Sequence, residues 1–230
     1  MTELARHSRA ASDTRVGSLL FIMSVFLVAV MIVFSTTDAV TMGVDEGEMP
    51  PNIEGKAHRF GAGDNWEDFD LYDLTYSNWT EGDLNHSWFV VEFMSTDCSA
   101  CMSFGDKIEE LSVRYKGIVT FIAVAVDFEN NEKFTSTPEE IIAFQEKTDF
   151  MGCNYGTGNC NARSGGPHEE VLYVDDRDAS SMKEWGVSGT PTSYILKPNG
   201  IVAWNQRNNG GEELGDAMYR LIPTDGLGGA

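Results

Sequence analysis

The chain has 230 residues and a formal net charge of −20, from 36 acidic and 16 basic residues. A surface this acidic excludes a nucleic-acid-binding protein, because such proteins need basic side chains against the phosphate backbone. With 42% hydrophobic residues the chain is not disordered throughout, and 4 cysteines are too few for a small disulfide-scaffolded protein. One domain of ordinary size with extensions is expected.

Residues 16–34 form an uncharged, apolar run. As a helix this run would be about 28 Å long, close to the thickness of about 30 Å of the hydrocarbon core of a bilayer. Arginines precede it and acidic residues follow it, which predicts a cytoplasmic segment at 1–15, a single-pass transmembrane anchor, and a C-terminal domain outside the cytoplasm. A cleaved signal peptide with a small-x-small site at 37–39 is the alternative, but the length of the run favours an uncleaved anchor.

The rest of the chain divides by composition. Residues 35–55 contain Asp, Glu, Gly and Pro-Pro without periodicity, which predicts a flexible acidic linker. Residues 56–222 are the predicted folded domain, and residues 223–230 are a predicted disordered tail.

The predicted domain alternates strands and helices. Nearly continuous apolar runs indicate buried strands, and apolar residues at spacings of four, three and four indicate an amphipathic helix. Strands are expected at 69–74, 88–94, 119–126 and 170–174, with a hairpin of 192–196 and 201–204, and helices at 101–115, 137–150, 180–185 and 212–221. This order predicts an α/β fold with a central mixed sheet flanked by helices.

A C-x-x-C motif lies between the strand at 88–94 and the helix that follows it. Cys98 is nearer to the exposed amides of the helix N-terminus, which stabilise a thiolate, so it is the expected nucleophile. Cys101, one turn further on, is expected to resolve a mixed disulfide. Half of a zinc site would need a second pair at the same spacing, which is missing. An inert disulfide is disfavoured because so short a loop gains little closure entropy.

The runs FVVEFMSTDCSAC at 89–101 and GVSGTPT at 186–192 together resemble the thioredoxin superfamily. They are most similar to its membrane-anchored, exported TlpA/ResA-like (AhpC/TSA-related) thiol-disulfide oxidoreductases, and the similarity covers roughly residues 69–221. The resemblance implies a thioredoxin-like fold. It implies no cofactor, because exchange chemistry resides in the sulfurs. The implied partners are protein thiol or disulfide substrates and a membrane or exported electron donor.

The resemblance also implies roles for three further residues. Glu92, six residues before Cys98, falls on the buried acid of the family, which exchanges a proton with the second cysteine. A carboxyl group buried in this way should have a raised pKa, whereas the alternative is an ordinary carboxylate on an exposed strand face. Pro191 falls on a cis proline, and Thr190 would offer its backbone to a substrate strand. Spacing alone is equally consistent with a trans proline at a strand start.

Two positions depart from the family at the site itself, and both predict a poorer oxidant. The basic residue or proline often found around the second cysteine is absent, and Met102 follows Cys101. Where these proteins usually carry Trp before the first cysteine, this chain has Asp97. A neighbouring anion is expected to raise the pKa of Cys98 and to stabilise the oxidised form, which predicts a reductant.

A segment at 151–168 reads as an insertion rich in Gly, Asn and Cys. Outside the cytoplasm its plain interpretation is a structural disulfide between Cys153 and Cys160. A metal site formed by these cysteines and His168, or a second redox relay to the active pair, are the alternatives. Without a fourth obvious ligand, no metal is predicted.

The expected function is therefore that of an exported, membrane-tethered thiol-disulfide oxidoreductase. A peroxiredoxin-like thiol peroxidase is one alternative, although Val91 stands where its upstream proline is expected. A non-enzymatic thioredoxin-fold binding module is the other. Asn78 and Asn85 begin two N-x-S/T sequons before the active-site strand and are candidates for glycosylation.

Overall fold

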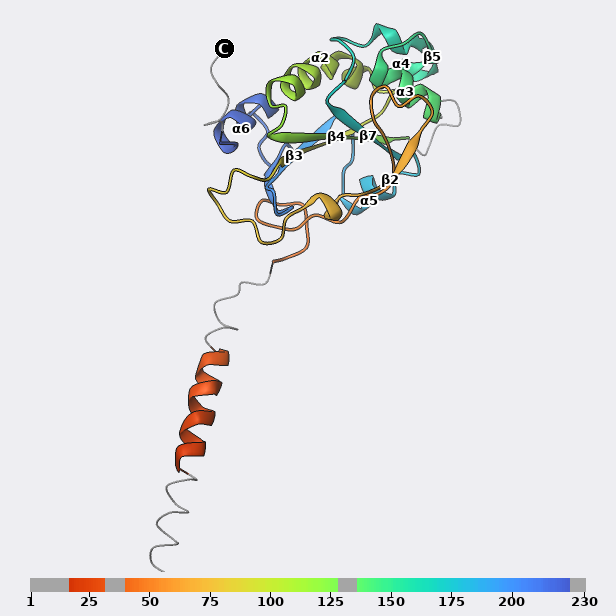
Figure 1. The fold of residues 1–230 in the computed structure, drawn as a ribbon. Coiled ribbons are helices and arrows are strands. Elements are labelled where there is room, and N and C mark those ends of the chain that lie inside the picture. The colour runs from red at the N-terminus through yellow and green to blue at the C-terminus, as the bar shows by residue number, and fades with distance from the viewer. Residues whose placement is uncertain (1–16, 32–39, 128–135, 224–230) are drawn as a thin grey trace, which may run out of the picture. The chain divides into compact units, whose positions relative to one another are not determined.

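The computed structural model describes residues 17–31, 40–127 and 136–223 (Figure 1). The chain divides into two compact units, Met1–Val40 and Thr41–Ala230. In the first unit, residues 17–31 are helical and their apolar side chains are exposed except for that of Val30, which is partly buried. Among the described residues, no helix has both the length and the apolar character needed to cross a membrane. The predicted cytoplasmic segment, both ends of the predicted anchor and the site at 37–39 lie outside the described residues.

The second unit is built on a seven-stranded mixed sheet with the strand order β2-β1-β7-β4-β3-β8-β9. The central strands β3, β4 and β7 are parallel, and the outer strands pair in antiparallel fashion. The sheet strands are β1 (Glu54–His58), β2 (Trp66–Asp70), β3 (Trp88–Met94), β4 (Val119–Val126), β7 (Val171–Asp176), β8 (Thr192–Leu196) and β9 (Val202–Asn205). A separate two-stranded ribbon in the insertion consists of β5 (Met151–Gly152) and β6 (Gly158–Asn159).

Helices cover both faces of the sheet, as the sequence predicts for a thioredoxin-like α/β fold (Figure 1). One apolar cluster joins the face that carries Val90 and Phe121 to helices α2, α3 and α6, and a second joins the opposite face to α5. The helices are α2 (Ser99–Arg114), α3 (Pro138–Glu146), the single turn α4 (Cys153–Gly156), α5 (Ser180–Glu184) and α6 (Leu214–Leu221), with 3-10 turns η1 (Tyr72–Leu74) and η2 (Cys160–Ala162).

The C-terminal boundary of the flexible linker predicted at 35–55 is wrong, because the folded domain begins before residue 55. Residues from Thr41 onward belong to the folded unit, Ile53 is fully buried, and strand β1 begins at Glu54. The backbone carbonyl of Pro51 accepts a hydrogen bond from the indole of Trp185. This polar segment therefore folds by docking onto the domain, which periodicity does not reveal.

Two predicted elements end earlier than expected. The strand predicted at 69–74 stops at Asp70, whose carboxylate accepts the backbone N–H groups of Tyr72 and Asp73 and starts a 3-10 turn. The helix predicted at 137–150 begins as expected, with the Thr137 hydroxyl as its N-cap, but ends at Glu146. The next residue, Lys147, has a positive φ of 57°, which a helix cannot continue.

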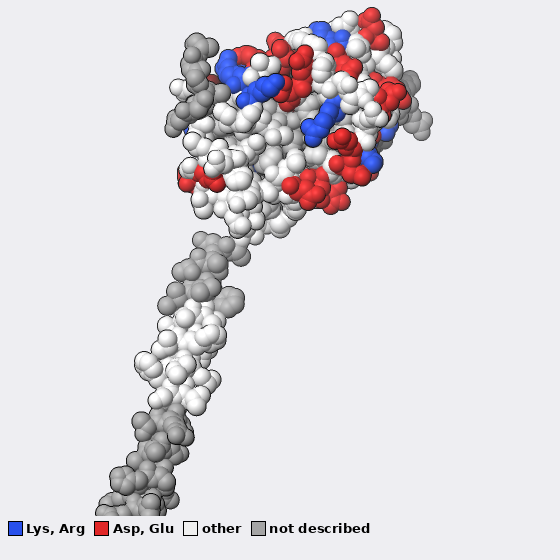
Figure 2. Space-filling view, viewed as in Figure 1, with Lys and Arg blue, Asp and Glu red and all other residues white. Residues whose placement is uncertain are grey.

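Acidic side chains form several patches on the face of the domain shown in Figure 2, with Lys and Arg between them. The predominance of acidic patches agrees with the net charge of −20. All residues of the expected disordered tail after Pro223 lie outside the described residues.

Candidate active site

The C-x-x-C motif lies where the buried central strand β3 passes into helix α2. Cys98 is the N-cap residue of α2, and its Sγ accepts a hydrogen bond of 3.2 Å from the backbone N–H of Cys101. Cys101 lies within the first turn, and both residues are free thiols with little exposed surface. The sequence-predicted arrangement of nucleophile and resolving cysteine is therefore available in the fold.

The two thiols differ strongly in acidity. Hydrogen bonding from the Cys101 thiol and from backbone N–H groups at the start of α2 lowers the pKa of Cys98 to about 6, against the opposing effect of burial. Burial, and then the neighbouring Cys98, raise the pKa of Cys101 well above its ordinary value. Near neutral pH, Cys98 is thus the thiolate and Cys101 keeps its proton, which is the division of roles that exchange requires.

Glu92 is buried in the middle of strand β3, as the resemblance implies. Burial, together with the charge of Cys98, raises the pKa of Glu92 to about 8, while the charge of Arg163 opposes the shift. Glu92 and Cys101 line the same small cavity, of about 10 Å³. A carboxyl group with this pKa beside the resolving thiol can accept or supply its proton.

The loop before strand β8 completes the site. The Thr190–Pro191 peptide bond is cis, in agreement with the expectation for Pro191. The Sγ of Cys98 lies 3.3 Å from the backbone carbonyl oxygen of Thr190, and both loop residues remain partly exposed. Two segments separated by some ninety residues thus meet at the nucleophilic sulfur.

Asp97 does not act on Cys98 as predicted. Its Oδ1 accepts the backbone N–H of Gly156 at 2.8 Å, and its backbone carbonyl accepts the N–H of Tyr155. The side chain is buried, and burial raises the pKa of Asp97 itself. The prediction of a raised pKa for Cys98 is wrong, because the carboxyl group is engaged by the insertion and the pKa of Cys98 is lowered instead.

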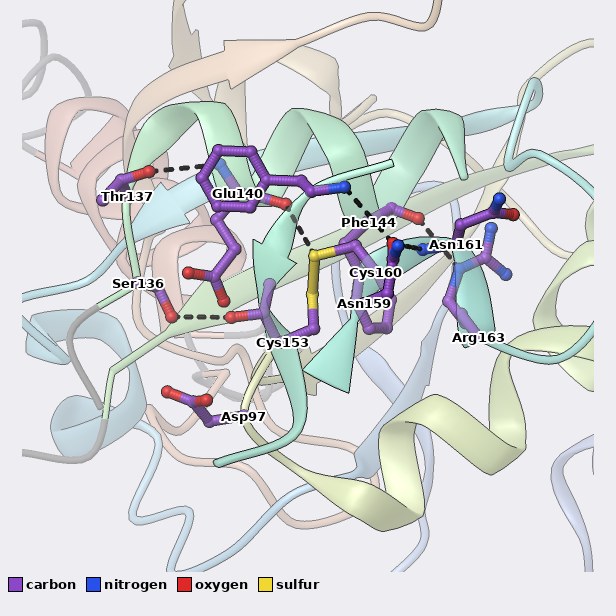
Figure 3. Close-up of a disulfide and its surroundings, with 12 residues drawn as sticks. Asp97, Ser136, Thr137, Glu140, Phe144, Cys153, Asn159, Cys160, Asn161 and Arg163 are labelled. Atoms are coloured by element: carbon purple, nitrogen blue, oxygen red, sulfur yellow. Dashed lines mark hydrogen bonds between the residues drawn. A yellow bond between two sulfur atoms is a disulfide. The ribbon is translucent and has the colours of Figure 1, made fainter. Parts of the chain in front are cut away.

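The insertion contains the predicted disulfide. Cys153 and Cys160 are bonded, with Cα atoms 5.1 Å apart, and both are fully buried (Figure 3). The Glu140 carboxylate lies beside the disulfide, with one oxygen within 4.8 Å of both sulfurs. Among the described residues, Oε1 of Glu140 has no hydrogen-bond partner. The sulfurs of Cys153 and Cys160 are bonded to each other and are therefore not free thiolates.

His168 does not join these cysteines, so the alternative metal site of Cys153, Cys160 and His168 is not formed. Its two ring nitrogens contact Tyr173 on one side and Arg163 and the Gly105 carbonyl on the other. This network borders Glu92 and Cys101 instead of the disulfide.

The sequence does not indicate a role for Arg163 or Tyr173. Tyr173 lines the cavity beside Glu92 and Cys101, and Arg163 contacts His168, which lines the same cavity. Arg163 comes from a loop rich in polar and glycine residues, where nothing in the pattern indicates burial. A signal for it exists in Gly105, because a glycine in the middle of an amphipathic helix is unfavourable unless another group needs the space.

Two other sequence features lie away from the cysteines. Asn78 and Asn85 are exposed in the loop before β3, and the Asn85 amide donates to Asp83. A cavity of about 650 Å³ is lined by residues at the opposite ends of the parallel strands, including Phe89 and Val171, and by none of the cysteines.

No protein-family model matches the chain, and a search of curated proteins gave no match. Among solved structures it is similar to a thiol:disulfide interchange protein DsbE from Chlorobium tepidum, with 16% identity, a TM-score of 0.48, and coverage of 77% of this chain and 98% of that one. A secreted Mycobacterium tuberculosis disulfide oxidoreductase gives 14% identity and a TM-score of 0.41 over 68% and 91%. A reduced Plasmodium vivax 2-Cys peroxiredoxin has 11% sequence identity and a TM-score of 0.45, and the similarity covers 69% of each chain. Similarity at this level specifies no activity.

Proposed function

We propose that the chain is an exported, membrane-tethered thiol-disulfide oxidoreductase of the TlpA/ResA type that exchanges disulfides with protein cysteines. The observation that carries the proposal is the asymmetry of one thiol pair. Cys98 has a lowered pKa at a helix N-terminus, Cys101 has a raised one, and Glu92 shares a cavity with Cys101. A pair held in a purely structural role needs neither the thiolate nor the buried acid.

The geometry supports a balanced exchange reaction. The Cys98 thiolate attacks one sulfur of a client disulfide, forms a mixed disulfide, and releases a client thiolate that takes a proton from solvent. Cys101 gives its proton to the Glu92 carboxylate and attacks the Cys98 sulfur. The second client sulfur then leaves as a thiolate and is protonated. The client disulfide is reduced to a dithiol, and the Cys98–Cys101 pair is oxidised to a disulfide.

The client would bind beside the cis-proline loop. An extended client segment that pairs with the backbone of Thr190 would place its own sulfur near Sγ of Cys98, because the Thr190 carbonyl lies 3.3 Å from that atom. Main-chain pairing of this kind favours client strands with little dependence on their side chains.

The direction of electron flow follows from the acidity of Cys98. In thioredoxin, a reductant, the nucleophilic cysteine has a pKa of about 7 and the cysteine pair has a reduction potential of about −270 mV. In the oxidant DsbA the pKa is about 3.5 and the reduction potential is about −120 mV. The pKa of Cys98, about 6, is nearer to the first. The proposal of a reductant therefore rests on the pKa of Cys98 and no longer on the increase in that pKa that was predicted from Asp97.

Export and tethering are supported by the apolar run at 16–34, with its arginines before and acids after, and by a disulfide in the insertion. An exported reductant needs a membrane or exported electron donor to restore its dithiol.

The experiment is single-turnover reduction of a disulfide-bonded peptide by the reduced full-length chain. Cys98→Ser should abolish reduction, and Cys101→Ser should trap a mixed disulfide with the peptide. Cys153→Ser/Cys160→Ser, which leaves the active pair intact, is the matched control and should retain reduction. Rapid turnover of hydrogen peroxide without peptide reduction would point to a peroxidase. Client binding that survives Cys98→Ser, with no exchange by the parent chain, would point to a binding module.

A further inference from the structure

Three side chains on adjacent strands lie in one row across the sheet. Glu92 of β3 is in register with Ala123 of β4, and Ala123 is in register with Tyr173 of β7. Side chains in register on neighbouring strands point to the same face, and here that face lies under helix α2. Because Ala123 carries only a methyl group, the longer side chains of Glu92 and Tyr173 can approach each other above it.

The hydroxyl group of Tyr173 is held by a second row of buried side chains. Its Oη lies 2.7 Å from Nδ1 of His168, and Nε2 of His168 lies 2.6 Å from Nη1 of Arg163 and 2.8 Å from the Gly105 carbonyl oxygen. Burial and the charge of Arg163 lower the pKa of His168 to about 3, so the imidazole is neutral near pH 7.

Nε2 of His168 faces both a donor, Nη1 of Arg163, and an acceptor, the Gly105 carbonyl oxygen, so two placements of the imidazole proton compete. A guanidinium group can only donate, and as the charged neighbour it makes a stronger hydrogen bond than the Gly105 carbonyl oxygen, so we infer the tautomer in which Nε2 of His168 accepts from Arg163. The imidazole proton is thereby assigned to Nδ1, which donates to Tyr173. The O–H of Tyr173 is then free to donate elsewhere.

The guanidinium group of Arg163 is held in place by several contacts and can therefore position His168 and, through it, Tyr173. Arg163 is fully buried, its Nε donates to the Phe144 carbonyl at 2.8 Å, and its Nη2 donates to the Gly166 carbonyl at 2.8 Å. Its guanidinium also lies over the Phe144 ring. Its charge lowers the pKa of Glu92, which is the buried acid of the site.

The cavity of about 10 Å³ joins the two rows, because Glu92, Cys101, His168 and Tyr173 all line it. Its volume is about that of one water molecule. We propose that Tyr173, positioned by His168 and Arg163, donates a hydrogen bond through a single water molecule to the Glu92 carboxylate and thereby keeps Glu92 able to accept the proton of Cys101. The inference rests on the proposed function and makes Tyr173 a positioning residue for its resolving step.

The step at issue is the attack of Cys101 on the mixed disulfide. The proton leaves the Cys101 sulfur for the Glu92 carboxylate, the Cys101–Cys98 bond forms, the bond between Cys98 and the client breaks, and the electron pair leaves with the client sulfur. Only ionised Glu92 can take that proton. A hydrogen bond from Tyr173 favours the ionised form, so its loss should raise the pKa of Glu92.

The pH dependence also involves the other groups that face Glu92. Helix α2 contributes Cys98 and Cys101, the insertion contributes Arg163, and strand β7 contributes Tyr173, whose own pKa burial raises above its ordinary value. Arg163 stays charged and Tyr173 stays protonated near neutral pH, so neither changes its charge while Glu92 titrates.

The test uses the reduced full-length chain and a nitrobenzoate disulfide, whose released thiolate absorbs visible light. The first phase reports attack by Cys98, and the second reports resolution by Cys101. In the parent chain the rate of the second phase should rise with pH around a midpoint near 8. In Tyr173→Phe we expect a midpoint about one unit higher, a second phase about tenfold slower at pH 7, convergence of the rates near pH 10, and an unchanged first phase.

Tyr194→Phe is the matched control, because Tyr194 is also a fully buried strand tyrosine but belongs to the opposite face of the sheet. It should leave both phases and the midpoint unchanged. His168→Gln, a second route to the same row, should move the midpoint in the same direction as Tyr173→Phe. An unshifted midpoint in folded Tyr173→Phe or folded His168→Gln would overturn the inference while two phases in the parent chain upheld the proposed function. Absence of both phases in the parent chain would instead refute the proposed function.

Discussion

Gly105 of helix α2 and Arg163 of the insertion fit together so closely that a Cβ atom on Gly105 would lie 2.7 Å from Nη1 of Arg163 and 2.8 Å from its Cγ. The glycine therefore leaves room for a buried cation next to the resolving cysteine. A residue that is unfavourable in a helix interior has its reason in tertiary structure, since the space beside it is occupied by a group of the active-site border.

Gly105→Ala should destabilise the fold by about 1–3 kcal/mol, because the new methyl group overlaps a fully buried side chain. Gly215→Ala is the control in helix α6, where a Cβ would meet the flexible end of Lys107 at 3.3 Å and Cδ2 of Leu111 at an ordinary contact distance of 3.6 Å. It should stabilise the fold by up to about 1 kcal/mol, as alanine normally does in a helix. Urea unfolding of both variants measures the difference. Equal effects would show that Arg163 does not occupy this space.

Asp97→Asn should shift the pKa of Cys98 by less than about 0.5, because the side chain serves the insertion and not the thiolate. The amide oxygen of Asn can still accept the Gly156 N–H, so the loop contact is retained. Titration of thiolate absorbance in the reduced chain measures the pKa. A fall of one unit or more on removal of the charge would restore the electrostatic role that the sequence suggested for Asp97.

Glu92→Gln should remove a pH dependence of stability. Burial raises the folded-state pKa of Glu92 to about 8, above its ordinary value of 4.5, so folding favours the protonated form. The associated stability is fully present below pH 4.5 and is lost as pH rises toward 8, with a magnitude on the order of 4 kcal/mol. Unfolding free energies at pH 5 and pH 8 should therefore differ less in Glu92→Gln than in the parent chain. An identical difference in both would mean that Glu92 is ionised without cost.

Replacement of the second cysteine pair should affect stability more than chemistry. Cys153→Ser/Cys160→Ser removes a crosslink that closes a short loop, and the expected loss is about 2–3 kcal/mol of unfolding free energy. Chemical unfolding measures this loss, and the nitrobenzoate assay checks that both exchange phases persist. A folded variant without the resolving phase would instead assign this disulfide to the reaction.

The parts of the fold that burial dictates could be predicted from the sequence. The uninterrupted apolar run at 119–126 predicts a strand covered on both faces, and β4 lies at Val119–Val126. The hydroxyl of Thr137 caps helix α3 as its pattern indicates. Strand β1 was missed, since its sequence EGKAH has no alternation and it forms by pairing with strands distant in the chain.

The residues of the candidate site also fall into two groups, those that could be predicted from the sequence and those that could not. Cys98 and Cys101 could be found from the C-x-x-C motif at the start of a helix, and Glu92 and Pro191 from the resemblance of their positions to those of a known family. Tyr173 could not, because its role depends on the register that places it across Ala123 from Glu92. Pairing register between strands that lie far apart in sequence is a tertiary property, and no local pattern encodes it.

The reduction potential of the Cys98–Cys101 couple tests the central claim most directly. The full-length chain would be equilibrated with glutathione buffers at pH 7, with Cys153→Ser/Cys160→Ser as a control that isolates the active pair. A value below about −200 mV is predicted, because the acidity of Cys98 is nearer to that of thioredoxin than to that of DsbA. A value near −120 mV would identify a disulfide donor and contradict the proposed direction, and a pair that does not equilibrate with glutathione would contradict exchange chemistry altogether.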